Sequence, residues 1–239
     1  MRETGIPISA IQPASAPLAP PMPVAAVRRI ALLGNPNCGK TALFNLLTGS
    51  RQKVANYPGV TVERKSGVIV TPAGRRVEAL DLPGAYSLNA SASDQALTRD
   101  IITGNSSEPP PELLVCVVDA TRLALNLQLV LQAQRLGVPM VLALNMSDME
   151  RAQSISIDTQ ALSTALGMPV VCTKKKKKGG AQQLLELLDQ ASPLSGATSS
   201  RPWHPPAMGD ILANRQTIRE ILDRAVRDPQ RQWLWSDRF

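Results

Sequence analysis

A chain of 239 residues is long enough for one complete α/β domain with a smaller appendage. Its 44% hydrophobic and 19% charged residues are typical of a soluble globular protein, and no apolar run approaches the ~20 residues of a membrane span. The formal charge is +7, and one run, Lys174 to Lys178, supplies five of the positive charges. This concentration in one segment argues against a broad basic face that binds nucleic acid. A single histidine and three widely spaced cysteines argue against a zinc site or a histidine-based catalytic triad.

Residues 1–26 are rich in Pro and Ala and are predicted to form a disordered arm. Across residues 27–191, short apolar runs alternate with helix-length periodic segments, which predicts a mostly parallel sheet with helices on both faces. Six strands are predicted, at Arg28–Leu33, Val62–Val70, Arg75–Leu80, Leu113–Val118, Pro139–Leu144 and Pro169–Cys172. Five helices are predicted among them, at Lys40–Leu47, Asp94–Ile102, Leu123–Leu136, Asp158–Leu166 and Ala181–Asp189.

The first predicted strand leads into the sequence GNPNCGKT, which fits the phosphate-binding pattern G-x-x-x-x-G-K-[ST] between a strand and a helix. Its two glycines let backbone amides turn towards phosphate oxygens. Lys40 is expected to reach the outer phosphates, and the Thr41 hydroxyl can ligate magnesium. The residues expected to contact nucleotide here are Gly34, Asn35, Pro36, Asn37, Cys38, Gly39, Lys40 and Thr41.

The stretch NYPGVTVE, residues 56–63, lies between the first helix and the second strand. A mobile loop that closes over the γ-phosphate is expected at this position, with Thr61 completing the magnesium shell. A plain surface loop is the alternative interpretation of the stretch taken by itself.

The third strand ends in DLPG, and the fifth ends in NMSD. In the first motif a carboxylate would face the magnesium shell and a glycine amide could approach the γ-phosphate; its residues are Asp81, Leu82, Pro83 and Gly84. In the second, Asp148 would accept hydrogen bonds from the N1 and N2 donors of guanine, which adenine lacks, so the motif favours GTP. Its residues are Asn145, Met146, Ser147 and Asp148, a tetrapeptide that in isolation is more often a simple turn.

Beyond the predicted sheet, residues 192–208 are rich in Ser, Pro and Gly and are interpreted as a linker. Residues 209–239 are expected to form a short helical domain, with its main helix at Asp210–Arg227. The apolar stripe predicted for that helix consists of Ile211, Leu212, Ile218, Ile221, Leu222, Ala225 and Val226.

In their order and spacing, the four motifs resemble the amino-terminal GTPase domain of the FeoB ferrous iron transport proteins, over about Arg28 to Leu188. Met146, where most GTPases have lysine, is itself a mark of that family. The resemblance implies an α/β P-loop GTPase fold with a six-stranded, mostly parallel sheet flanked by helices and a small α-helical C-terminal appendage. It also implies a domain that binds GTP and GDP and hydrolyses GTP slowly, regulating an Fe²⁺ transporter.

Ala85 stands where many GTPases carry a water-orienting glutamine directly after the D-x-x-G glycine. Hydrolysis must then rely on backbone groups and cations, and the resemblance implies K⁺ at Asn37, although Asn37 could instead brace the phosphate loop. The expected catalytic residues are Lys40, Thr61, Gly84 and Asn37, and the expected Mg²⁺ ligands are Thr41, Thr61 and Asp81.

In the family, the loop after the sixth strand usually carries a small Ser-Ala pair that approaches guanine. Lys174 and Lys175 align with that pair here. Because adjacent ammonium groups repel one another, we expect a mobile loop and weakened base selectivity.

The resemblance further implies the partners and the location of the chain. Expected partners are guanine nucleotide, a downstream transmembrane domain of the same protein and small accessory proteins of iron transport, without nucleic acid. The chain itself would be a soluble cytoplasmic domain at the inner membrane, in an oligomeric state that the sequence does not indicate. Two alternatives stay open: an RNA or ribosome-assembly factor that uses the lysine run, and a nucleotide switch without useful hydrolysis.

Overall fold

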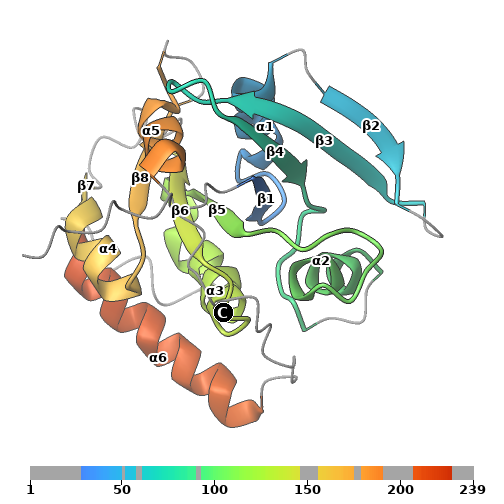
Figure 1. The fold of residues 1–239 in the computed structure, drawn as a ribbon. Helices are drawn as coiled ribbons and strands as arrows, with labels where there is room; N and C mark the ends of the chain where they lie inside the picture. The colour runs from blue at the N-terminus through green and yellow to red at the C-terminus, as the bar shows by residue number, and fades with distance from the viewer. Residues whose placement is uncertain are drawn as a thin grey trace, which may run out of the picture.

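A seven-stranded sheet organises the protein, in the order β2-β3-β4-β1-β5-β6-β8 (Figure 1). The structure, a computed structural model, describes residues 28–49, 52–57, 61–89, 93–145, 156–174, 179–190 and 207–227. The strands of the sheet are β1 (Arg29–Gly34), β2 (Gln52–Asn56), β3 (Glu63–Val70), β4 (Arg76–Asp81), β5 (Leu113–Asp119), β6 (Met140–Asn145) and β8 (Val170–Thr173). Strand β1 pairs in parallel with β4 and β5, and β6 pairs in parallel with β5 and β8. Within this sheet, the described pairs are antiparallel only at the β2-β3-β4 edge.

Helices cover both faces of the sheet because the buried strands carry apolar side chains on both sides. The helices are α1 (Lys40–Thr48), α2 (Ser93–Thr103), the 3₁₀ turn η1 (Ala120–Arg122), α3 (Leu123–Gln134), α4 (Thr159–Leu166), α5 (Gln182–Gln190) and α6 (Met208–Ala225). Ile30 and Leu32 of β1 pack with α1 and α5 on one face. Ala31 and Leu33 pack on the other face, in the cluster that includes α2, α3, α4 and α6.

The mostly parallel sheet flanked by helices is confirmed, but it has seven strands instead of the six predicted. The additional strand, β2, reads QKVAN and is exposed over four of its five residues. Without a buried face it carries no alternating apolar pattern, so periodicity could not reveal it. A second sheet, of two-residue strands β7 (Ser156–Ile157) and β9 (Val226–Arg227), was also not predicted.

Helix α6 packs against α3 and α4 along the outside of the domain (Figure 1). Its contact is made by the buried side chains of Ile218, Ile221, Leu222 and Ala225. The predicted stripe was wrong at its start, where Ile211 is 39% exposed and Leu212 is 58% exposed. The start of α6 instead meets the end of α3 through polar groups. Arg135 donates to Asn214 Oδ1 at 2.9 Å and lies 3.5 Å from the Asp210 carboxylate.

The parallel strands determine where a site can form, because their carboxyl ends meet at one edge of the sheet. Strand β1 ends at Gly34, β4 at Asp81, β6 at Asn145 and β8 at Thr173. The predicted phosphate, metal and base motifs therefore begin at a common edge. In the described part of the chain, no helix combines the length and the apolar character that a membrane span requires.

Candidate functional site: a phosphate loop beside a base pocket

The loop from Gly34 to Lys40 turns tightly between β1 and α1. Asn37 has φ of 65° and Gly39 has φ of 95°, both in the left-handed region. A Cβ on Gly34 would lie 2.6 Å from Cys38 Sγ and 2.7 Å from the Val117 carbonyl oxygen, so only glycine fits there. The loop closes with a 3.3 Å bond from the Cys38 amide to the Asn35 carbonyl. Its backbone amides are thereby gathered around the N-terminus of α1, an arrangement that favours anions.

Lys40 and Thr41 both meet Asp81, which ends β4. The Lys40 ammonium forms an ion pair with one carboxylate oxygen, and Thr41 Oγ1 donates to the other at 3.1 Å. Lys40 is 8% exposed and Asp81 is 6% exposed, so each charge is buried beside its counter-charge. The structure thus brings together three predicted residues from two motifs that are 40 positions apart in the chain.

The oxygen donors of Thr41 and Asp81 fit Mg²⁺, which typically takes one or two protein oxygens and completes its shell with phosphates and water. A three-ligand cage built from His, Cys, Asp or Glu is not found in the described ranges. The donor set is therefore suited to a metal that arrives with a phosphate ligand.

The D-x-x-G segment lies directly against the phosphate loop. The Ala85 amide donates to the Gly34 carbonyl at 3.2 Å, and a Cβ on Gly84 would lie 3.3 Å from a Pro36 side-chain carbon. Leu82 is tied to β1 through its own amide, which donates to the Leu32 carbonyl at 3.2 Å. The Ala85 side chain is fully buried and has no polar group with which to orient water.

Asn145, at the end of β6, connects the base motif to the phosphate loop. Its side-chain amide donates to the Cys38 carbonyl at 3.0 Å. A Cβ on Gly39 would lie 2.2 Å from the same Asn145 nitrogen, so the two segments are in direct contact. The remaining residues of the predicted motif, Met146, Ser147 and Asp148, lie outside the described residues.

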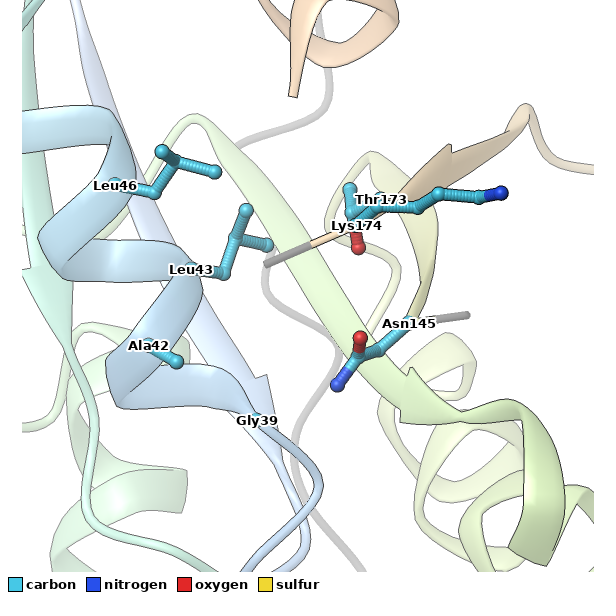
Figure 2. Close-up of a pocket in the computed structure, with 7 residues that line it drawn as sticks. All are labelled: Gly39, Ala42, Leu43, Leu46, Asn145, Thr173 and Lys174. Carbon is cyan, nitrogen blue, oxygen red and sulfur yellow. The ribbon is translucent and has the colours of Figure 1, made fainter. Parts of the chain in front are cut away.

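A small pocket lies between α1 and the ends of β6 and β8. Figure 2 shows Leu43 and Leu46 of α1 on one side of this pocket and Asn145, Thr173 and Lys174 on the other. Gly39 and Ala42 complete its lining. One apolar wall opposite polar strand ends suits a flat, partly polar ring such as a nucleotide base.

Lys174 begins the lysine run at the rim of this pocket. Its backbone amide donates to the Gly180 carbonyl at 2.8 Å, which joins the two ends of the loop. Lys175, the second residue predicted near the base, lies outside the described residues.

Thr61, the third expected metal ligand, is exposed. No hydrogen bond joins Thr61 to Thr41 or Asp81 among the residues that the structure describes. The site thus brings Thr41 and Asp81 together but not Thr61.

The three cysteines are free thiols, and burial affects two of them strongly. Desolvation raises the pKa of the Cys38 thiol to about 11, against a smaller lowering by the backbone hydrogen bond and charge of Lys40. The pKa of the fully buried Cys116 is also raised, first of all by desolvation. A raised pKa makes the thiol a poor nucleophile, so neither cysteine is suited to covalent chemistry.

Two groups of residues escaped prediction. The pocket wall of Ala42, Leu43 and Leu46 resembles any apolar helix face in sequence, and Thr173 resembles any strand end. Their only signal was their position next to the phosphate loop and the lysine run. The second group, Arg64 and Glu108, lies beside the Thr61 segment and had no sequence signal because the two residues are 44 positions apart.

A sequence model described as "Ferrous iron transport protein B" matches residues 28–188. The chain belongs to this family. The Fe(2+) transporter FeoB of Salmonella typhimurium is 46% identical over 205 residues, which cover 86% of this chain and 26% of the relative. The Fe(2+) transporter FeoB of Escherichia coli K12 is 38% identical over the same shares. The chain thus spans about a quarter of the length of these FeoB relatives.

Solved FeoB structures have the same fold. The G domain of FeoB from T. maritima superposes with a TM-score of 0.62 at 37% identity, over 68% of this chain and 97% of that one. The cytosolic domain of FeoB from L. pneumophila gives 0.69 at 33% identity, over 84% and 100%. A mutant NFeoB from S. thermophilus, bound to GDP, gives 0.63 at 41% identity, over 70% and 62%. The expected P-loop GTPase fold of a FeoB G domain is therefore confirmed.

Proposed function

We propose that the chain binds GTP and hydrolyses it slowly to GDP and phosphate, as the cytosolic G domain of a ferrous iron transporter. The observation that carries this proposal is the convergence of Lys40 and Thr41 on Asp81, which joins the phosphate loop to the D-x-x-G motif. A solved relative from S. thermophilus is bound to GDP, and one from T. maritima is in a GMPPNP form. Family membership also argues against an RNA or ribosome-assembly factor.

In the proposed complex the phosphates lie in the Gly34–Thr41 loop and the base enters the pocket beside Asn145. The Asp148 carboxylate would accept hydrogen bonds from N1 and N2 of guanine and so select that base. Lys174 and Lys175 would close over the base, with base selectivity weaker than in relatives that carry small residues there. The Asn145 bond to Cys38 supports this arrangement because it keeps the base and phosphate segments in contact.

Thr41, Asp81 and Thr61 are the proposed protein ligands of Mg²⁺. When bound, the ion neutralises charge on the phosphate oxygens. Lys40 exchanges its partner Asp81 for the outer phosphates, and Thr61 approaches from its exposed position as GTP binds. Gly84, on which an added Cβ would lie 3.3 Å from a Pro36 side-chain carbon, would donate its amide to the γ-phosphate.

Slow turnover follows from the buried alanine after Gly84. Ala85 offers no side-chain group to hold the attacking water, which supports the proposed reliance on cations. Asn37, an exposed residue of the phosphate loop with φ of 65°, is the proposed K⁺ ligand.

In the full protein, residues 27–191 would form the G domain, 192–208 a linker and 209–239 a short helical domain that leads to a membrane region. The transmembrane part and small accessory proteins of iron transport are the proposed partners, at the inner face of the membrane. The matched residues cover only 26% of the longer relative from Salmonella typhimurium, which supports that arrangement.

The proposal is tested by measuring binding of fluorescent GDP and phosphate release from GTP and ATP. Binding followed by slow release from GTP supports a GTPase. GDP binding without phosphate release from GTP selects the nucleotide switch without hydrolysis. Absence of both GDP binding and phosphate release contradicts the proposal.

A further inference from the structure

The first residues of β3 pair with β2 but no longer with β4. The register between β3 and β4 ends with Lys65 opposite Asp81. Arg64, the next residue towards Thr61, pairs with Ala55 of β2 alone among the described strands. Because β2 is an exposed edge strand, the sheet holds this end of β3 weakly.

Arg64 is held instead by a side chain from another part of the fold. Its Nε lies 2.7 Å from Glu108 Oε1 and its Nη2 lies 3.0 Å from Glu108 Oε2, which makes a bidentate salt bridge. The third nitrogen, Nη1, donates to Ser66 Oγ at 2.9 Å. The side chains of Arg64 and Glu108 are 20% and 14% exposed, so the pair is largely shielded from water. We call this pair the Arg64–Glu108 clasp.

The position of Glu108 is fixed because its segment forms hydrogen bonds and an ion pair with the start of β1, the strand that leads into the phosphate loop. Arg29 of β1 donates to the Pro109 carbonyl at 3.2 Å and lies 3.6 Å from the Glu108 carboxylate. The Arg28 amide donates to Glu112 at 3.0 Å. The clasp therefore joins the start of β3 to the same element that positions the phosphates.

Thr61 lies three residues before Arg64, and the residue that follows it, Val62, is anchored through its backbone carbonyl. The Tyr57 amide donates to the Val62 carbonyl at 3.0 Å. Tyr57 is only 2% exposed and belongs to the main core cluster. Thr61 and Val62 directly precede β3, so the direction in which β3 begins affects where Thr61 lies.

We propose that Arg64 and Glu108 are positioning residues for Thr61. The Arg64–Glu108 clasp fixes the start of β3 so that Thr61 meets the γ-phosphate side of the nucleotide. This inference rests on the proposed function, in which Thr61 contacts GTP but not GDP. Loss of the clasp therefore weakens binding of the triphosphate and slows its hydrolysis, while binding of GDP is unaffected.

The test compares fluorescent GDP and fluorescent GMPPNP on the wild-type chain and two variants. Glu108→Gln removes the negative charge of the acceptor. Arg64→Lys keeps the positive charge but loses the guanidinium, which donates to both carboxylate oxygens. Lys65→Gln is the matched control, because Lys65 is the adjacent residue of β3 and forms an exposed ion pair with Glu63 at 3.2 Å. Thermal unfolding of each variant, together with kcat and KM for GTP, accompanies the titrations.

We expect about tenfold weaker GMPPNP binding and lower kcat for Glu108→Gln, with GDP binding within about twofold of wild type. Arg64→Lys should shift in the same direction by a smaller factor, and Lys65→Gln should match wild type. Should Glu108→Gln unfold, Arg64→Lys, which retains the stem and charge, decides the result. Equal weakening of both nucleotides, or of neither, would overturn the positioning role. A wild-type chain that binds neither nucleotide would instead overturn the proposed function and, with it, this inference.

Discussion

The side-chain amide of Asn145 donates to the backbone carbonyl of Cys38 over 3.0 Å, across 107 positions of sequence. One residue closes the strand that leads to the base motif, and the other lies in the middle of the phosphate loop. This hydrogen bond links the two halves of the proposed nucleotide site. The groups proposed to hold the base and those proposed to hold the phosphates are therefore positioned together.

Replacing Asn145 by alanine should weaken guanine nucleotide binding by about fivefold, because the hydrogen bond that holds the phosphate loop contributes ~1 kcal/mol. Titration of fluorescent GDP measures the change. Asn214→Ala is the control, since Asn214 accepts an exposed hydrogen bond from Arg135 at the far side of the domain. Equal affinities for the wild type and Asn145→Ala would contradict the coupling of the two segments.

Gly39→Ala should abolish nucleotide binding. The new Cβ would lie 2.2 Å from Asn145 Nδ2 and would also force alanine into φ of 95°. Gly167→Ala separates the two effects, because Gly167 has φ of 64° in the left-handed region but nothing within 4 Å of the added carbon. Both variants should lose about 1 kcal/mol of stability from the backbone conformation. Nucleotide binding should fail only in Gly39→Ala, and normal binding by that variant would show that the close contact has no role.

Asp81→Asn should remove the effect of Mg²⁺ on nucleotide release. The carboxylate is both the counter-charge of Lys40 and a proposed metal ligand, so the affinity for Mg²⁺ should fall about tenfold or more. Release of fluorescent GDP is measured with Mg²⁺ and after chelation. The wild type should respond to chelation and the variant should not. Asp189→Asn, which loses bonds to Thr71 and Ala73 in a distant turn, should respond as the wild type does.

The cysteines should differ in their reaction with iodoacetamide at pH 8. Burial raises the pKa of Cys38 to about 11, so only about 0.1% is thiolate at that pH. Cys172, which is half-buried, should be labelled first, while Cys38 and Cys116 should be protected. The rate at Cys38 should rise about tenfold from pH 8 to pH 9 because the thiolate fraction rises by that factor. Mass spectrometry of the labelled peptides measures both rates, and equal labelling of Cys38 and Cys172 would contradict the burial.

The same raised pKa has a consequence for stability. A thiol that binds its proton more tightly when folded than when unfolded stabilises the fold fully below the unfolded value of ~8.5. For Cys38, that contribution is lost as the pH rises towards 11. Unfolding midpoints should therefore fall over this range less steeply in Cys38→Ser than in the wild type.

Much of the fold was predictable because its elements carry local signals. Strand β1 and helix α1 flank a phosphate loop that only a few residue types can form, and the turn at 71–74 closes with a 2.9 Å bond from Gly74 to Thr71, as the ProAlaGly sequence suggests. Strand β2 gave no signal because almost all of its residues are exposed. The prediction of a buried stripe was wrong at the start of α6, because Ile211 and Leu212 continue the helical apolar period but are exposed to solvent.

The site was predictable only as a set of motifs. Strand ends and motif order predicted that the phosphate loop would meet Asp81, since parallel strands bring their carboxyl ends to one edge. Contacts that depend on register and on long separations could not be predicted from the chain, among them the Asn145 bond to Cys38 and the Arg64–Glu108 clasp. Such pairs follow from tertiary packing, for which a single sequence carries no periodic pattern.

Phosphate release in matched potassium and sodium buffers shows whether the GTPase site uses cations in place of a glutamine. The wild-type chain and Asn37→Ala are compared with GTP and with ATP, both with Mg²⁺. We predict slow release from GTP that is faster in potassium, loss of that difference in Asn37→Ala, and slower release from ATP. Equal rates in both salts would remove the potassium role, and no release from either nucleotide by the wild-type chain would show that the site is not a GTPase.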